Sequence, residues 1–270
     1  MTTYVLRNHQ SATIAGDGQN EDILHLDGTS AMETPTATFV GSDALIGVND
    51  SGTLTQHGYG VINLMPGAAI STQTLTVNRA NLLINERPGS SFTFNGVNNI
   101  VTGSTLTATG YAGVSNYTLN GTMNIDGTST VNLDYVKVNG SGRFHLMGED
   151  ALLRLGSTDP STTVVLDGGM LSLANGMSFL GTITVSAPLS SRIGPMSCVD
   201  VYNAMSAASE TFNRTTGVLD LFDAHGTEVA NLKFAGTGDL YATPTSGLAT
   251  NYMVISAHPS VGALPVTFTS

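Results

Sequence analysis

The chain has 270 residues, a formal net charge of −11 and only 9 lysine and arginine residues. So few cations argue against binding to nucleic acid or to an anionic membrane surface, because both are held mainly by basic side chains. Charged residues make up only 11% of the chain. Gly, Ser, Thr and Asn are abundant instead, and β-branched residues recur along the sequence. This composition predicts an all-β protein of many short strands. No stretch approaches 18 consecutive apolar residues, so no membrane-spanning helix is expected.

Residues 1–54 predict short strands separated by acidic turns, and we expect them to form a β-rich cap or an assembly segment. The first ten residues contain no basic region followed by an apolar stretch, so no classical secretory signal is expected there. Residues 16–22 are similar to the calcium-binding nonapeptide, in a single copy that is one residue out of register. Oxygen ligands at this density suit Ca²⁺. We favour a plain acidic turn, because a calcium roll needs stacked copies.

Residues 55–195 alternate between apolar and polar side chains in short pairs, as half-buried strands require. Turn sequences such as Asn95-Gly96 and Asn120-Gly121 separate the pairs. A sandwich has strands of about 5–6 residues joined by hairpins, whereas a solenoid coils shorter strands into rungs. We therefore expect a β-solenoid, parallel β-helix-like, with about seven rungs if each coil takes ~20 residues. The expected core side chains are Leu75, Val77, Leu82, Ile84, Phe92, Phe94, Leu106, Ala108, Leu119, Met123, Ile125, Val131, Leu133, Val136, Val138, Phe144, Leu146, Leu153, Leu155, Val164, Leu166, Leu171, Leu173, Ile183 and Val185.

Residues 196–270 are expected to form a C-terminal β module that begins with a short helix near residues 199–209. Val201, Met205 and Ala208 would share one face of that helix, and Asp200 would be its N-cap. The remainder of the segment alternates as strands do.

Two turns and one longer segment resemble secreted proteins of bacterial surfaces. The turns are Asn-Gly-Thr at 120–122 and Asp-Gly-Thr at 126–128, and the segment is 216–236, with a hairpin turn expected at 223–226. The segment is similar to units of the form G-x-L-x-L-x-D-x-x-G-x-x-x-A-x-L-x-F-x-G in autotransporter passengers, filamentous-haemagglutinin-like adhesins and other secreted β-strand-repeat proteins. The resemblance implies an extracellular, non-enzymatic role in adhesion or matrix.

The residues that could carry chemistry form no pattern that predicts an enzyme, and we assign no catalytic, cofactor-binding or metal-ligating residue. Adjacent acids at 21–22 and 149–150 point to opposite faces of a strand, so neighbours alone do not make a pair for sugar cleavage. The histidines lack metal-ligand spacing, and His25 and His145 are expected on the outer faces of strands. Spacing leaves open whether acids from different rungs converge; the candidates are Asp134, Asp159 and Asp167.

Three further features have plain structural interpretations. Cys198, the single cysteine, is expected to be a small buried side chain. Alternating threonines at 72–76 and 105–109 fit strand propensity better than an ice-binding ladder, because they do not recur at a constant interval. Asn-x-Ser/Thr triplets arise by chance in a chain so rich in these residues.

These observations predict a non-enzymatic extracellular structural protein that self-associates end to end, into a surface or biofilm-matrix fibre or an adhesive coat. The physical reason is that the end rungs of a solenoid expose unpaired backbone groups that template further pairing. The expected partners are other copies of the chain and a cell-surface polysaccharide, and export without a classical N-terminal signal is expected. The first alternative is a carbohydrate-binding or carbohydrate-cleaving β-helix, similar to a phage tailspike, which a cross-rung acid cluster or exposed aromatic residues would favour. The second alternative is a cytoplasmic scaffold.

Overall fold

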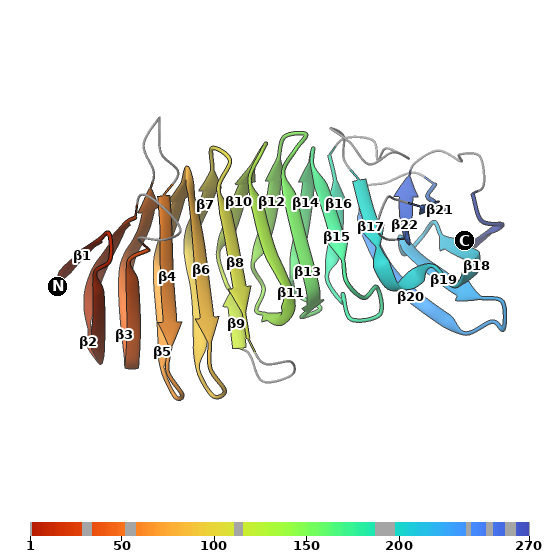
Figure 1. Ribbon diagram of the computed structural model, residues 1–270. Coiled ribbons are helices and arrows are strands. Elements are labelled where there is room, and N and C mark those ends of the chain that lie inside the picture. Colours follow the sequence, from red (N-terminus) through yellow and green to blue (C-terminus); the bar gives the residue numbers. More distant parts are fainter. Residues whose placement is uncertain are drawn as a thin grey trace.

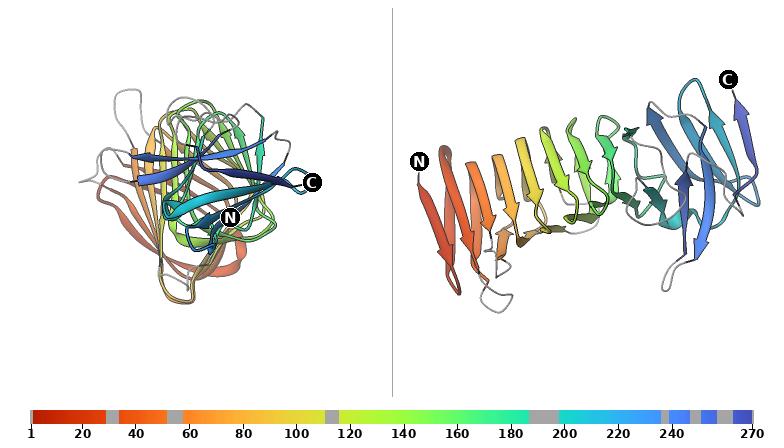
Figure 2. Two further views of the ribbon diagram at one scale, coloured as in Figure 1. Left: turned by 90° about the vertical axis from the view of Figure 1, so that its right-hand side faces the viewer. Right: turned by 90° about the horizontal axis from the view of Figure 1, so that it is seen from above.

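The protein is an elongated β-solenoid of about seven turns, followed by a smaller antiparallel module (Figures 1 and 2). The computed structural model describes residues 2–28, 34–51, 58–110, 116–186, 198–235, 239–246, 251–256 and 263–269. A complete coil contributes three strand segments, and each segment pairs in parallel with its equivalent one coil away. The solenoid therefore has three sides, which we call side A, side B and side C in chain order.

The strands divide among the three sides as follows. Side A holds β4 (Gly58–Leu64), β6 (Ala80–Glu86), β8 (Thr105–Thr109), β15 (Met170–Leu173), β17 (Cys198–Val201) and the first parts of β2 (Ser11–Asp27), β3 (Thr36–Ser51), β11 (Thr130–Asn139) and β13 (Leu152–Thr158). Side B holds β9 (Asn116–Leu119), the first parts of β5 (Ala69–Asn78) and β7 (Ser91–Val101), and later parts of β3, β11 and β13. Side C holds β1 (Thr3–Arg7), β10 (Thr122–Asp126), β12 (Arg143–Met147), β14 (Thr163–Asp167), β16 (Thr182–Val185) and the last parts of β2, β3, β5 and β7.

The core follows directly from the alternation in the sequence. Every side chain expected in it is 4% exposed or less, apart from Val185, which packs partly buried against the others. Equivalent positions stack from coil to coil, so that Phe144 pairs with Met123 on one neighbouring strand and Val164 on the other. Because each coil covers the apolar residues of the next, the prediction of a parallel β-solenoid is confirmed.

The Asn-Gly sequences form the corners between side B and side C. Gly96 has a φ of +52°, which favours glycine over other residues. The corners also stack tightly, because a Cβ added at Gly121 would lie 1.9 Å from the carbonyl oxygen of Gly96. These dipeptides therefore allow the backbones of successive coils to approach closely, and they do not form hairpin turns.

The chain changes to antiparallel pairing after the solenoid. β18 (Ala207–Asn213), β19 (Val218–Asp223) and β20 (Glu228–Ala235) form an antiparallel meander. β21 (Tyr241–Ser246) and β22 (Asn251–Ser256) form a second antiparallel pair, β22 also pairs with β17, and β23 (Val266–Thr269) pairs with β18. The hairpin turn expected at 223–226 is confirmed, because the N–H of Gly226 donates to the carbonyl of Asp223.

The helix expected near 199–209 is wrong. The segment forms β17, a 3₁₀ turn over Tyr202–Ala204, and β18, and no side chain caps the turn. Val199 and Val201 alternate with period 2 and continue the side A column below Leu171 and Leu173. Burial against the preceding coil therefore outweighs the local helical pattern.

Residues 1–54 share the parallel pairing of the solenoid. β1 pairs with β2, β2 with β3, and β3 with both β4 and β5, all in parallel. Among the described residues, the parallel coil pattern is thus present from β1 onward, and it is the same in β3, before residue 52, as in β4 and β5, after residue 57.

Candidate functional sites: the ends of the long sheet and the hollowed side A

One sheet runs along the whole molecule on side C. Its strand order is β1, β2, β3, β5, β7, β10, β12, β14, β16, β20, β19, β18 and β23. β16 pairs in parallel with β20, two antiparallel steps follow, and β18 pairs in parallel with β23. The two antiparallel steps cancel, so by its pairing β23 has the same sense in this ladder as β1. The two strands lie at opposite ends of the molecule (Figure 2).

β1 is the edge of this sheet at the N-terminal end of the rod, and within the described residues it pairs only with β2. The N–H of Ile23 donates to the carbonyl of Thr2, so the backbone groups of alternate residues from Thr2 onward face β2. Those of Thr3 and Val5 therefore face away from the sheet. The side chain of Val5 is 47% exposed, so this edge carries neither a charge nor a proline at its centre.

β23 is the edge at the other end. The N–H of Glu210 donates to the carbonyl of Pro265, and the N–H of Arg214 to that of Thr269. By the same alternation, the backbone groups of Val266 and Phe268 face away from β18. The strand is held in place by the Phe268 ring, which the Arg214 guanidinium covers at 4.2 Å from its centroid.

The neighbouring edge, on β21, is closed. The N–H of Ala242 donates to the Glu210 carboxylate, and the carbonyl of Ala242 accepts from Leu264. Pro244 lies in the same strand and has no N–H to offer. Proline and side-chain cover are the usual means of protecting an edge strand, and β21 has both.

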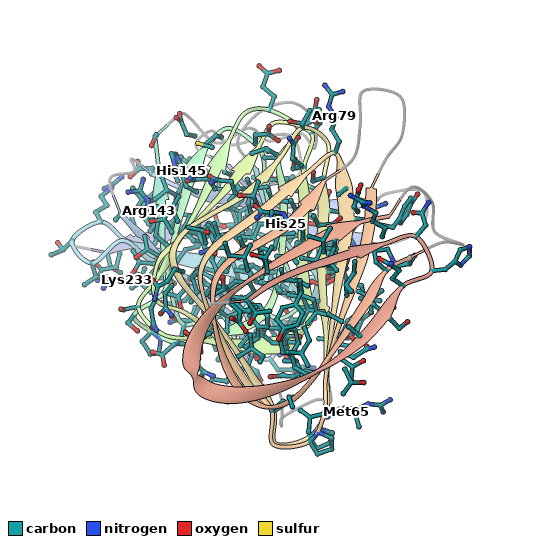
Figure 3. All side chains as sticks on the ribbon, turned by 90° about the vertical axis from the view of Figure 1, so that its left-hand side faces the viewer. His25, Met65, Arg79, Arg143, His145 and Lys233 are labelled. Carbon is teal, nitrogen blue, oxygen red and sulfur yellow. The ribbon has the colours of Figure 1, made fainter. Side chains whose placement is uncertain are left out.

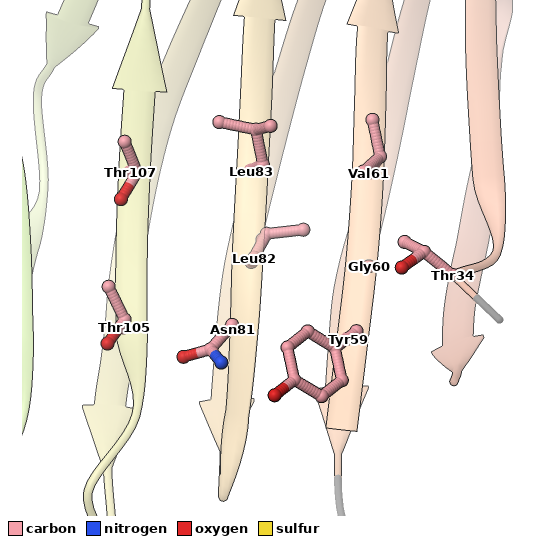
Figure 4. Close-up of a pocket in the computed structure, with 9 residues that line it drawn as sticks. All are labelled: Thr34, Tyr59, Gly60, Val61, Asn81, Leu82, Leu83, Thr105 and Thr107. Carbon is pink, nitrogen blue, oxygen red and sulfur yellow. The ribbon is translucent and has the colours of Figure 1, made fainter. Parts of the chain in front are cut away.

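Side A carries the second candidate site, a surface hollowed along several coils. A hollow of about 480 Å³ lies over β4, β6 and β8, where the Tyr59 ring projects toward Asn81 (Figure 4). Two more, of about 250 and 510 Å³, lie where side A turns into side B, and both are lined by Thr109 and Gly110. The last of them reaches Tyr135, whose side chain is 72% exposed, and Asn175.

Polar side chains on this surface are linked from coil to coil. The Nδ2 of Asn85 donates to the Oδ1 of Asn63 at 2.9 Å, and the Oγ1 of Thr109 donates to the Oδ1 of Asn85 at 2.8 Å. Further along the rod, Asn203 donates to Asn175 at 2.9 Å. Side A therefore presents hydrogen-bonding groups at the spacing of the coils.

Side A also holds a cross-coil cluster of charges. Asp134 and Arg154 approach to 4.0 Å, and Asp200 follows two strands further along the same outward row. Burial raises the pKa of Asp200 to about 6, with Ser172 and Arg154 opposing the rise and Asp134 adding to it. Burial also raises the pKa of Asp134, while Arg154 lowers it. The helix expected near 199–209 would have placed Asp200 at its N-terminus, and no spacing in the sequence indicates this proximity.

The other expected acids do not join this cluster. Asp159 lies at the corner between sides B and C, Asp167 ends a strand on side C, and Glu149 and Asp150 lie in an exposed turn. Among the described residues, no group of three or more His, Cys, Asp or Glu side chains could hold a metal ion. The side chains of residues 16–21, expected as an acidic turn, fall outside the described residues.

The histidines and threonines lie where strand geometry places them. His25 and His145 are on the outer face of side C, as predicted. Arg143, His145 and Lys233 lie on the same flank of the rod, on strands β12 and β20 (Figure 3). The threonine stretch at 72–76 lies partly in the core, since Thr72 is fully buried, while 105–109 lies on side A. The two stretches thus form no common flat ladder. The side chain of Cys198 is outside the described residues.

No protein-family model and no curated protein matches this chain. The resemblance to bacterial surface proteins therefore stays a prediction. The described residues contain no helix that is long and apolar enough to cross a membrane.

Proposed function

We propose that this protein is a non-enzymatic structural subunit that assembles end to end, with β1 of one copy adding in parallel to β23 of the next. The observation that supports the proposal is that, among the described residues, β1 and β23 each pair on one side only and form the two ends of one sheet, with the same sense in its pairing ladder. A head-to-tail contact between two different surfaces repeats from copy to copy, and it builds an open filament when the successive rotations do not close a ring. The resemblance of segment 216–236 to secreted repeat proteins favours an extracellular fibre or adhesive coat.

The chemistry of the two edges favours pairing. Natural proteins protect exposed edges with lysine, proline, bulges or covering loops. β1 contains neither lysine nor proline, and in the part of the chain that the structure describes no second strand pairs with it; β23 contains no charged residue. Strand addition would satisfy the outward-facing N–H and C=O groups of both strands and continue the side C ladder into the next molecule.

Negative-stain electron microscopy and light scattering of the purified protein test the proposal. We expect filaments from the wild type and none from Val5→Pro, since proline removes an N–H that faces away from β2. Val5→Thr is the matched control, because it changes the side chain and keeps the N–H. Circular dichroism and thermal unfolding establish that each variant remains folded.

A second variant distinguishes head-to-tail pairing from other contacts. Val266→Pro removes an outward N–H at the other edge, so it should also abolish filaments. Dimers that survive in Val266→Pro and vanish in Val5→Pro would show β1 pairing with β1, and would overturn the filament. A wild type that stays monomeric across concentration would overturn it as well.

A further inference from the structure

The hollowed surface of side A has a shape suited to a long ligand. The hollows follow one another over β4, β6, β8, β11 and β13 to the residues after β15. At about 4.8 Å for each step between strands, this run is about 24 Å long. A ligand that fills it lies along the rod axis and crosses several coils.

The backbone of side A is not available to such a ligand. β6 pairs with β4 on one side and β8 on the other, and β13 pairs with β11 and β15. A peptide strand therefore has no edge to join here. Recognition must come from the side chains that line the hollows. These include hydroxyls, carboxamides and two tyrosine rings, beside apolar side chains such as Val61 and Leu83 and a few charged ones.

These side chains suit a sugar chain. Carboxamides and hydroxyls both donate and accept hydrogen bonds, as sugar hydroxyls do. Asn63, Asn85 and Thr109 form a connected row at the spacing of the coils, and Asn175 lies at the far end. Tyr135 offers an exposed ring whose apolar face can cover the apolar face of a pyranose, while its hydroxyl stays in water.

The charges favour a neutral ligand. A polyanion meets a chain with a net charge of −11. The hollows themselves are lined by two acids, Glu86 and Asp134, and by two cations, Arg87 and Lys137, so a polycation meets positive as well as negative charge there. Neither a polyanion nor a polycation is therefore attracted to this surface by its charge, and a neutral chain meets no charge repulsion.

We propose that side A binds a neutral linear polysaccharide, laid along the rod axis with one sugar ring against Tyr135. The site is built from side chains of successive coils, so affinity grows with the length of the oligosaccharide until the hollows are filled. It is separate from the ends of the long sheet and does not depend on assembly.

An array of neutral, carboxylated and amino-bearing oligosaccharides of increasing length tests the proposal, followed by calorimetry on the best neutral ligand. We expect a neutral chain to bind, and Tyr135→Ala to weaken its binding by roughly tenfold, the effect of losing one aromatic contact at the centre of a site. Tyr135→Phe should retain most of the affinity, because it keeps the ring.

Val97→Ala is the matched control, since Val97 is 50% exposed on side C, away from the hollows. Equal binding by Tyr135→Ala and Val97→Ala would overturn the proposal. Preferential binding of a charged polysaccharide, affinity that does not change between mono- and oligosaccharides, or no neutral glycan bound at all would also overturn it. Because Val5→Pro blocks only assembly, it should bind the glycan as the wild type does.

Discussion

The carboxylate of Asp50 occupies the space that a side chain on Gly60 would need. A Cβ built on Gly60 would lie 2.9 Å from Oδ2 of Asp50 and 2.6 Å from Cδ1 of Leu26. Position 60 on side A therefore needs a glycine, because the buried carboxylate of Asp50 reaches across the coil from side C and fills the space beside it. Asp50 itself is fully buried, and neither of its oxygens has a hydrogen-bond partner among the described residues.

Gly60→Ala should destabilise the protein by about 1–3 kcal/mol, because the added methyl overpacks this point of the core. Urea unfolding followed by circular dichroism measures the change. Gly47→Ala is the control, since its nearest neighbour is a threonine hydroxyl at 3.2 Å that can move. Equal losses in the two variants would contradict the packing explanation.

Asp50 should make the stability depend on pH. Burial, and then the charge of Asp27, raises the pKa of Asp50 from 3.8 to about 8. The folded state therefore keeps a proton that the unfolded chain releases above pH 4, so stability is greatest below pH 4 and falls as pH rises toward 8. Asp50→Asn cannot ionise and should lose this dependence.

Unfolding titrations of Asp50→Asn and the wild type at several pH values measure the effect. We expect the stability of the variant relative to the wild type to rise by a few kcal/mol between pH 5 and pH 9. Asp167→Asn, at an exposed position on side C, is the matched control. A difference between Asp50→Asn and the wild type that stays constant with pH would show that Asp50 is ionised in the folded protein.

The stacked corner at Gly121 should tolerate no side chain. Its Cβ would lie 1.9 Å from the carbonyl oxygen of Gly96, and that oxygen belongs to backbone that cannot turn away. Gly121→Ala should therefore lower the unfolding free energy by about 2–4 kcal/mol. At Gly127 the nearest atom is 3.5 Å away, so Gly127→Ala should stay within about 1 kcal/mol of the wild type.

The Asn63–Asn85–Thr109 row should stabilise the solenoid modestly. Asn85→Ala removes two side-chain hydrogen bonds at a partly exposed site, and about 0.5–1.5 kcal/mol should be lost for each bond. A double-mutant cycle with Asn63→Ala isolates the bond between the two carboxamides. Additive losses from the two substitutions would mean that the pair contributes no coupling.

The solenoid interior could be predicted from the sequence because the information is local. A residue such as Phe92 or Phe94 lies two positions from its partner, and the pleat of a strand turns both to the same side. The Asn-Gly turns were located correctly for the same reason. The role of these turns could not be predicted, because Asn-Gly occurs both in hairpins and at solenoid corners. The two differ in whether the backbone of a neighbouring coil stacks on the turn.

The helix near 199–209 was predicted wrongly because its local pattern competes with burial against the previous coil. The same distant pairing brings Asp200 near Arg154 and Asp134, which no spacing rule connects. Exposure of Tyr135 also follows from the bend in β11, where the register shifts between Leu133 and Lys137.

The sequence by itself determined that the chain is β, that its strands are short, and which side chains face inward, since each depends on alternation within a few residues. Only the tertiary structure decided which outward side chains share a surface and where the open edges lie. Both depend on how many residues separate equivalent positions in successive coils. That number varies: Asn85 and Asn63 are 22 residues apart, whereas Asn203 and Asn175 are 28 apart. A variable offset leaves no period in the sequence, because loops of any length can close the same coil as long as the stacked core is kept.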